Sequence, residues 1–274
     1  MLKEIIKKLS NQSGSTSGSN STGSLALGDT LLDFGRLNAM ARDNRESYQV
    51  NTPFPHVVVD NFLSKDSLKV VLDAIPEPDL SKQKRDNSAK TQGGMKAQHG
   101  KVGLNDEGKL NPVMRQLFWE LNSQGFLRFL QRLTDIDGLL PDPTLRGGGV
   151  HQTKRGGLLR VHADFNKHPV YNLDRRINFI LYLNPDWKEE YGGHLELWDR
   201  DVTECQSRVL PILNRCVIFN TSSWSFHGHP HPLTCPDDMY RRSIAMYYYS
   251  NGRPASDDSD EKHATIWPAL PGEK

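Results

Sequence analysis

The second half of the chain contains a series of short runs that are rich in β-branched and aromatic residues and are separated by Gly, Pro, Asn and Asp. Such runs are typical of short antiparallel strands joined by turns, and they predict a sandwich or jelly roll. Six of these runs lie at residues 158–165, 177–184, 193–199, 207–213, 216–220 and 243–250. With weaker candidates at 149–153 and 225–229, we expect about eight strands in a core that spans residues 143–252.

The residues before this core predict a helical support. Apolar residues at helical spacing over 111–133 predict two helices that break near Gly125, and residues 31–45 predict a weaker helix. Residues 57–59 predict a strand, and Ser64 is suited to cap a helix over 65–74. The run 177–184 has one apolar face and one mixed face, as expected of a strand with helices behind it and a polar cavity in front. We therefore expect residues 30–142 to cover one face of the mostly β core.

Other segments are predicted to lie outside the packed elements. Residues 1–10 predict a short amphipathic helix, which packs on its own domain or meets a partner or membrane surface. Residues 11–29 are rich in Ser and Gly and predict a flexible linker, while residues 253–274 predict an acidic, solvated tail. Residues 81–101 are basic and aperiodic, so we expect either a solvated loop or a lid that attracts an anionic substrate.

Composition excludes several classes of protein. The chain carries 34 Lys and Arg residues against 33 Asp and Glu residues, and this balance argues against a nucleic-acid partner. No apolar run is long enough for a membrane span. Three separated cysteines and no recognisable signal peptide predict a reduced, cytoplasmic protein. Neither composition nor motifs indicate an oligomeric state.

A candidate metal site begins with His162 and Asp164, which are separated by one residue in a strand-like run. Residues at i and i+2 share one face of a strand, so an imidazole and a carboxylate would supply two ligands of a facial triad for Fe(II). The third ligand must come from another segment, and SFHGHPHP offers His227, His229 and His231. His227 ends a plausible strand, whereas the other two histidines precede prolines and are expected in an exposed loop. The predicted metal-binding and catalytic residues are therefore His162, Asp164 and His227.

A second candidate site lies fourteen residues after His227. If the open metal positions hold a 2-oxo acid, its distal carboxylate needs a buried cation, and the planar fork of Arg suits a carboxylate. Arg241 and Ser243 share one face of the last predicted strand, so their side chains would lie side by side. Arg242 would point to the opposite face.

The order of four segments resembles the prolyl 4-hydroxylase-like branch of the Fe(II)/2-oxoglutarate-dependent dioxygenases. The resemblance covers roughly residues 53–250, and the segments are HADF (162–165), NFILYLNPDWKEEYGGHLELWD (178–199), CVIFNTSSWSFHGHP (216–230) and RRSIAMYYYS (241–250). It implies a double-stranded β-helix, Fe(2+) as the metal, 2-oxoglutarate and O2 as co-substrates, and ascorbate as a candidate reductant. The implied reaction is oxidative decarboxylation coupled to hydroxylation of an aliphatic C–H bond, with release of succinate and CO2.

The resemblance also assigns roles to residues. His162, Asp164 and His227 match the iron ligands, Arg241 matches the residue that binds the distal carboxylate of 2-oxoglutarate, and Tyr182 matches a tyrosine that assists it. Four further residues are candidates for contacts with the ligands or the substrate: His151, Gln152, Asn178 and Trp224. For Trp224, core packing is the alternative.

The substrate and two other functional classes stay open. A prolyl residue in a peptide or protein is the family default, and a free amino acid or another small metabolite is the alternative substrate. A jelly-roll dioxygenase of the cupin type would use the same three ligands without a 2-oxo acid, and a non-catalytic jelly-roll binding module would use none of this chemistry.

Overall fold

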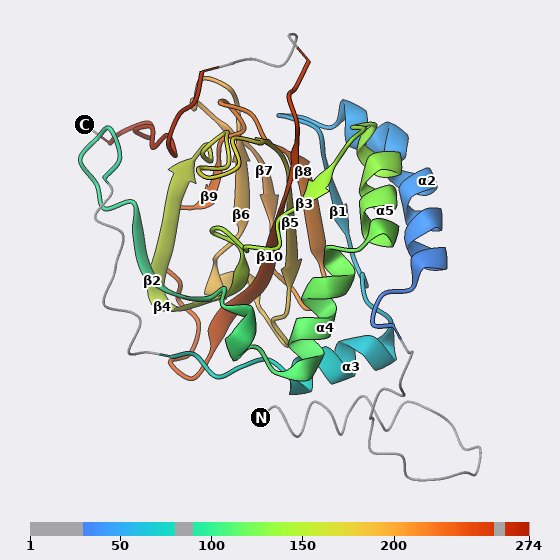
Figure 1. Cartoon of the computed structure of the whole chain (residues 1–274). Coiled ribbons are helices and arrows are strands. Elements are labelled where there is room, and N and C mark those ends of the chain that lie inside the picture. Colours follow the sequence, from blue (N-terminus) through green and yellow to red (C-terminus); the bar gives the residue numbers. More distant parts are fainter. Residues whose placement is uncertain (1–29, 80–89, 255–260, 274) are drawn as a thin grey trace.

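The computed structural model describes residues 30–79, 90–254 and 261–273 (Figure 1). The predicted N-terminal helix at 1–10 and linker at 11–29 lie outside these residues. The helices of the described part are α2 (Phe34–Val50), α3 (Lys65–Asp73), α4 (Pro112–Leu121) and α5 (Gln124–Thr134), with single 3-10 turns η2 (Glu107–Lys109) and η3 (Glu189–Tyr191). The strands are β1 (His56–Val59), β2 (Gln98–Leu104), β3 (Leu140–Pro141), β4 (Gly149–His162), β5 (Asp174–Tyr182), β6 (Leu195–Trp198), β7 (Cys205–Val209), β8 (Cys216–Asn220), β9 (His227–His229) and β10 (Tyr240–Ser250).

The strands form one mostly antiparallel sheet that curls into a nearly closed jelly roll, as predicted. Neighbouring strands follow the order β1-β8-β5-β10-β4-β9-β6-β7, and β2 adds to the free side of β4. β4 connects the two halves of the roll, because its first part pairs with β10 and its last part with β9. The strands predicted separately at 149–153 and 158–165 are therefore one strand. An irregular stretch at 154–157 bends it from one half to the other while β2 continues alongside.

Helices cover the outer face of the β5–β10 half, as the alternation in residues 177–184 predicted (Figure 1). Ile177, Phe179 and Leu181 belong to the largest apolar cluster, which also contains residues from all four described helices. Phe126 of α5 packs edge-on against Phe179, with 5.4 Å between the ring centroids. The alternate side chains of β5 face the interior of the roll, and this leaves a polar chamber between the two halves.

Local signals place the helices of the support. The Ser64 hydroxyl accepts a hydrogen bond from the Ser67 amide at 3.1 Å and begins α3, as predicted. The break predicted near Gly125 lies earlier, because Ser123 caps α5 through the Phe126 amide. Gly125 is inside α5, where the ring of Phe34 packs so closely that a Cβ atom would lie 2.7 Å from it. Close packing, not a turn, explains this glycine.

The basic segment predicted at 81–101 is only partly a loop. Residues 80–89 lie outside the described part, and residues 98–101 form the first half of β2, which pairs with β4. Within the described ranges, no helix combines the length and the apolar character needed to cross a bilayer.

Candidate active site

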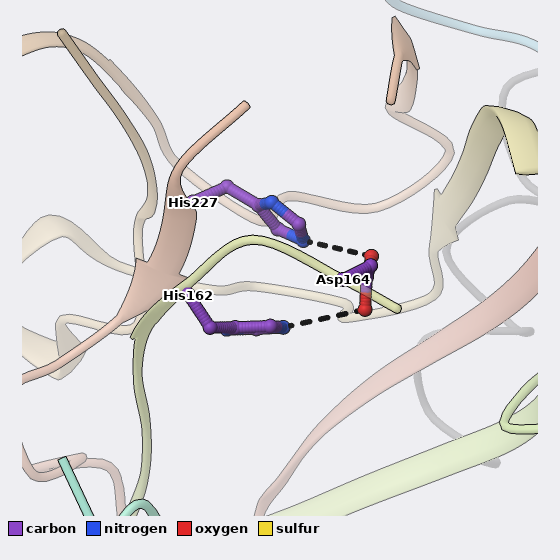
Figure 2. Close-up of side chains that lie close together, drawn as sticks. All are labelled: His162, Asp164 and His227. Atoms are coloured by element: carbon purple, nitrogen blue, oxygen red, sulfur yellow. Dashed lines mark ion pairs between the residues drawn. The ribbon is translucent and has the colours of Figure 1, made fainter. Parts of the chain in front are cut away.

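Three side chains with metal-binding atoms converge where β4 and β9 meet (Figure 2). His162 is the last residue of β4, and it lies opposite His227, the first residue of β9. Asp164 lies between the two imidazoles, with His162 Nε2 at 3.6 Å from Oδ1 and His227 Nε2 at 3.5 Å from Oδ2. The potential ligand atoms all lie within 4.8 Å of one another. The sequence predicted His162 and Asp164 in one strand. In the structure, Asp164 is two residues beyond the end of β4 and comes from the segment that follows the strand.

The backbone fixes both imidazoles in the form that a metal needs. His162 Nδ1 lies 2.8 Å from the Arg160 carbonyl oxygen, and His227 Nδ1 lies 2.9 Å from the Ser225 carbonyl oxygen. A carbonyl oxygen can only accept, so each Nδ1 carries the proton and each Nε2 keeps its lone pair. Burial lowers the pKa of His227 to about 4, so this ring is neutral at neutral pH. Both histidines are therefore prepared to bind a metal ion through Nε2.

A buried arginine and an amide hold the Asp164 carboxylate. Arg175 Nη2 and Asn178 Nδ2 both donate to Oδ2 at 2.8 Å. Burial alone would raise the pKa of Asp164, but the charge of Arg175 keeps it well below its ordinary value. Neither donor occupies Oδ1, so this oxygen is the one that a metal ion can take. Two neutral imidazoles and one carboxylate are the donor set of non-haem Fe(II) sites, and the residues present fit that ion.

Arg175 was not predicted from the sequence, and a strand irregularity explains why. Regular alternation would place Arg176, not Arg175, on the same face as Asn178. The register between β5 and β10 shifts between Tyr248 and Tyr249, opposite this segment, and the shift brings Arg175 to the inner face. There its guanidinium group lies 3.5 Å from the ring centroid of Tyr247 and is almost completely buried.

Replacing Arg175 with Met should weaken metal binding about 10- to 100-fold, because the partner that orients a metal ligand is removed. The same change should lower the free energy of unfolding by about 3 kcal/mol, since it leaves a buried carboxylate without its cation. A Co(II) titration and urea unfolding measure the two effects. Arg176→Met is the matched control: it removes the buried neighbour that donates to Ser250 Oγ and should leave metal affinity unchanged. Equal metal affinity in native protein and Arg175→Met would contradict this role.

Arg241 lies in the same chamber as the three potential ligands. Its Nε donates to the Gly193 carbonyl oxygen at 2.7 Å, and its Nη2 donates to the Tyr182 hydroxyl at 3.3 Å. Ser243 also lines the chamber. Gly193 has a φ of 72°, and a Cβ atom there would lie 3.0 Å from Arg241 Cδ, so glycine is required for this close approach. The predicted group of Arg241, Ser243 and Tyr182 is thus assembled, and it can receive a carboxylate.

The chamber is a cavity of about 210 Å³. Arg241 and the potential metal ligands share its lining with residues of β2, β4, β5 and β9 and of the C-terminal segment. A small two-headed acid with a metal-chelating group and a distal carboxylate matches these two groups of side chains.

The secondary candidates separate into two groups. Asn178 holds Asp164, and His151 lines the cavity. Gln152 faces the other side of β4, where its amide donates to the Pro76 carbonyl oxygen and accepts from Arg242. Trp224 is absent from the cavity lining and packs against Phe54, with 6.3 Å between the ring centroids.

The prediction for His229 was wrong. His229 belongs to β9, is buried and lines the cavity, because the strand that begins at His227 continues through it. Burial lowers its pKa well below the ordinary value. His231 is exposed, as expected of a loop residue.

The C-terminal segment differs from the predicted solvated tail. Residues 255–260 lie outside the described part, but residues 261–273 pack on the β core (Figure 1). Ala163, between His162 and Asp164, exchanges both backbone hydrogen bonds with Ile266. Trp267 stacks on His162 with 4.6 Å between the ring centroids and lines the cavity. Arg160 and Glu273 form a largely buried ion pair at 2.6 Å that anchors the end of the segment. The acidic composition of the segment predicted a solvated tail. Composition does not indicate these contacts, because backbone hydrogen bonds and one aromatic ring provide most of them.

Replacing Trp267 with Ala should weaken metal binding roughly 2- to 10-fold, the value of one aromatic stack on a ligand imidazole. A Co(II) titration measures the change, and Trp267→Phe should restore most of it. Trp119→Ala is the control, because Trp119 is exposed on α4. An unchanged affinity in Trp267→Ala would show that the stack does not position His162.

The fold and this site define a structural class: a jelly roll with a His-Asp-His group that could hold a metal ion, in the same cavity as a buried arginine that can receive a carboxylate. Residues 148–249, which form most of the β core, match the family model of the 2OG-Fe(II) oxygenase superfamily. A mouse relative, prolyl 3-hydroxylase OGFOD1, is 37% identical over 79 residues, which are 27% of this chain and 14% of that protein.

Solved structures support the same fold. A prolyl 4-hydroxylase from Phytophthora capsici aligns with a TM-score of 0.50 at 19% identity, over 84% of this chain and 69% of that one. A Trichoplax adhaerens prolyl hydroxylase, solved with a peptide of hypoxia inducible factor, aligns with a TM-score of 0.53 at 17% identity, over 79% of this chain and 91% of that one.

Proposed function

We propose that the protein is an Fe(II)- and 2-oxoglutarate-dependent dioxygenase that hydroxylates a prolyl residue or a proline-like substrate and releases succinate and CO2. One observation carries the proposal: a single cavity contains the His162, Asp164 and His227 ligand set together with Arg241. Neither a cupin-type dioxygenase without a 2-oxo acid nor a binding module needs this combination.

His162, Asp164 and His227 would hold Fe(II), which together with 2-oxoglutarate and O2 supplies the chemistry of oxidative decarboxylation and C–H hydroxylation. The contribution of the chain is geometry. Carbonyl oxygens of Arg160 and Ser225 fix the imidazole tautomers, and Arg175 with Asn178 fixes the carboxylate. These partners prevent the ligands from rotating when the metal is absent.

Arg241, Tyr182 and Ser243 would bind the distal carboxylate of 2-oxoglutarate. The guanidinium group is held by Gly193 and Tyr182, so its position is fixed before the co-substrate arrives. Burial raises the pKa of Tyr182, and its hydroxyl therefore keeps its proton and can donate to the carboxylate. Ile180 and Leu195 add apolar side chains to the cavity lining, and such surroundings strengthen these interactions.

A prolyl substrate is the part of the proposal that depends on relatives. The mouse relative is named as a prolyl 3-hydroxylase and two solved structures of the same fold are named as prolyl hydroxylases. A free amino acid or small metabolite is the competing substrate. A cytoplasmic location is also proposed, supported by three cysteines that form no disulfide.

The test begins with an anaerobic titration of the protein with Fe(II) and then 2-oxoglutarate. We expect a weak visible charge-transfer band that requires both additions, and succinate release on exposure to O2. A peptide library then identifies the substrate by a mass increase of one oxygen atom. Formation of neither the band nor succinate would refute the proposal.

A further inference from the structure

Lys101 is a half-buried cation that the proposed machinery does not use. It lies in β2 and lines the same cavity as Arg241 and the metal ligands. Within the described part of the chain, no hydrogen bond or ion pair joins its ammonium group to another residue. An unpaired cation in a partly dehydrated cavity is costly unless a ligand pairs with it.

Strand register places Lys101 in line with Arg241. Thr153 of β4 lies opposite Arg241 of β10 on one side and opposite Lys101 of β2 on the other. Cross-strand neighbours project to the same face, so all three side chains point into the roll. Strands are spaced about 4.8 Å apart, so the backbones at Lys101 and Arg241 are about 10 Å apart. The two cations therefore start from separate strands on one wall of the cavity.

A bulge directs Lys101 to the inner face. The register of β2 against β4 shifts between His99 and Lys101, opposite the bend of β4 at 154–157. Gly100 between them has a φ of 70°, and a Cβ atom there would lie 2.9 Å from Gly157 Cα. Two glycines thus allow the strands to cross closely at the bend, and bulges of this kind re-aim the next side chain.

The groups around Lys101 leave its charge without a partner. Arg241 of β10, His151 of β4 and His229 of β9 lie on its side of the cavity, and all are cationic or neutral. Asp164 attracts it from a distance, but Arg175 and Asn178 already occupy one oxygen of that carboxylate. Burial lowers the pKa of Lys101 to about 8, so the side chain is still mostly charged at neutral pH.

We propose that Lys101 binds an anionic group of the substrate that is hydroxylated, so that the preferred substrate carries a carboxylate near the reacting C–H bond. The inference rests on the proposed function, because it requires that Arg241 binds 2-oxoglutarate and so leaves Lys101 for the substrate. Thr153 and Gln98 also line the cavity beside Lys101 and can add hydrogen bonds to the same anion.

The first arm of the test needs no turnover. Protein loaded with Ni(II) and 2-oxoglutarate is titrated with sulfate by calorimetry, so that Arg241 is already occupied. The Lys101→Met variant should bind sulfate roughly 10- to 100-fold more weakly than native protein, and Lys101→Arg should retain binding. The Lys65→Met variant is the matched control, because Lys65 is exposed at the start of α3. Equal sulfate binding by native protein and Lys101→Met overturns the proposal.

The affinity for 2-oxoglutarate separates this proposal from the proposed function. In Lys101→Met it should stay within about threefold of native, because Arg241 holds the co-substrate. A large loss would show that Lys101 clamps 2-oxoglutarate and would also overturn the proposal. Absence of the charge-transfer band in native protein would instead refute the proposed function.

The second arm identifies where the substrate carboxylate lies. One matched pair is N-acetyl-L-proline and its amide, and the other is the blocked dipeptides Glu-Pro and Gln-Pro. Native protein should turn over the acid of one pair roughly tenfold or more faster than its neutral partner, and Lys101→Met should lose this preference. The pair that shows the preference tells whether the carboxylate belongs to the reacting residue or to its neighbour. Equal turnover of acid and neutral probes by native protein overturns the inference, and the sulfate arm decides if neither pair is hydroxylated.

Discussion

Replacing Asp164 with Asn should reduce Fe(II)-dependent succinate formation to below about 1% of native, because the single anionic ligand of the site is lost. The Asn side chain is close in size to that of Asp, so the shape of the side chain is kept while the negative charge is removed. Its Nδ2 group would meet Arg175 or Asn178, both of which donate to the native oxygen. We also expect metal affinity, measured by Co(II) titration, to fall at least about 100-fold.

Stability should respond less than activity in this variant. The buried Arg175 loses its carboxylate partner, which costs about 3 kcal/mol in a buried pair, although removing the desolvated carboxylate offsets part of that loss. Asp60→Asn is the control, because Asp60 forms a surface ion pair with Arg215 at 2.6 Å. It should retain metal binding and activity. An Asp164→Asn variant that binds Co(II) as tightly as native protein would show that the metal site has been misassigned.

The sequence could predict the parts of the site that depend on local pattern. His162 and Asp164 are two residues apart, and Arg241 and Ser243 alternate in one strand, so short-range geometry places each pair. The alternation in residues 177–184 predicted helices on one face of this strand and a chamber on the other. The packing of Phe179 against Phe126 confirms the helical face. These predictions needed only the period of a strand.

The parts that the sequence could not predict all depend on departures from that period. A register shift in β5 brings Arg175 rather than Arg176 to Asp164, and a bulge in β2 turns Lys101 inward. The β5 irregularity has no distinctive residue pattern, and the glycines at the β2–β4 bend do not reveal which neighbouring side chain turns inward, because the partner strand determines where extra residues are accommodated. His229 was misplaced for a different reason, since Pro230 directly after it suggested a loop where a short strand continues.

The C-terminal segment shows a different limit. Its sequence is polar and acidic near residue 257, and composition therefore favours a solvated tail. Its contacts are two backbone hydrogen bonds with Ala163, one aromatic stack on His162 and one buried ion pair with Arg160. Each is a single long-range contact that becomes visible only when β4 and the segment are placed side by side. Trp267 was therefore missed although it touches a predicted ligand.

Replacing Arg241 with Met should weaken 2-oxoglutarate binding roughly 100- to 1000-fold, because a buried carboxylate would lose its charged, bidentate partner. Met has a similar length, so the cavity keeps most of its packing while the charge and the donors are removed. The Tyr182 hydroxyl and Ser243 remain and supply weaker, neutral hydrogen bonds. Calorimetric titration of the Ni(II)-loaded protein with 2-oxoglutarate measures the affinity directly.

Arg242→Met is the matched control for this prediction. Arg242 is the next residue of β10, but its side chain faces away from the cavity and donates to Gln152. Loss of Arg242 should lower stability slightly and leave 2-oxoglutarate affinity within about threefold of native. Metal affinity should be retained in both variants, because neither side chain contacts Asp164 or the two histidines. If Arg241→Met and Arg242→Met bound 2-oxoglutarate equally well, the distal carboxylate would have to be held elsewhere, and Lys101 would be the next cation to test.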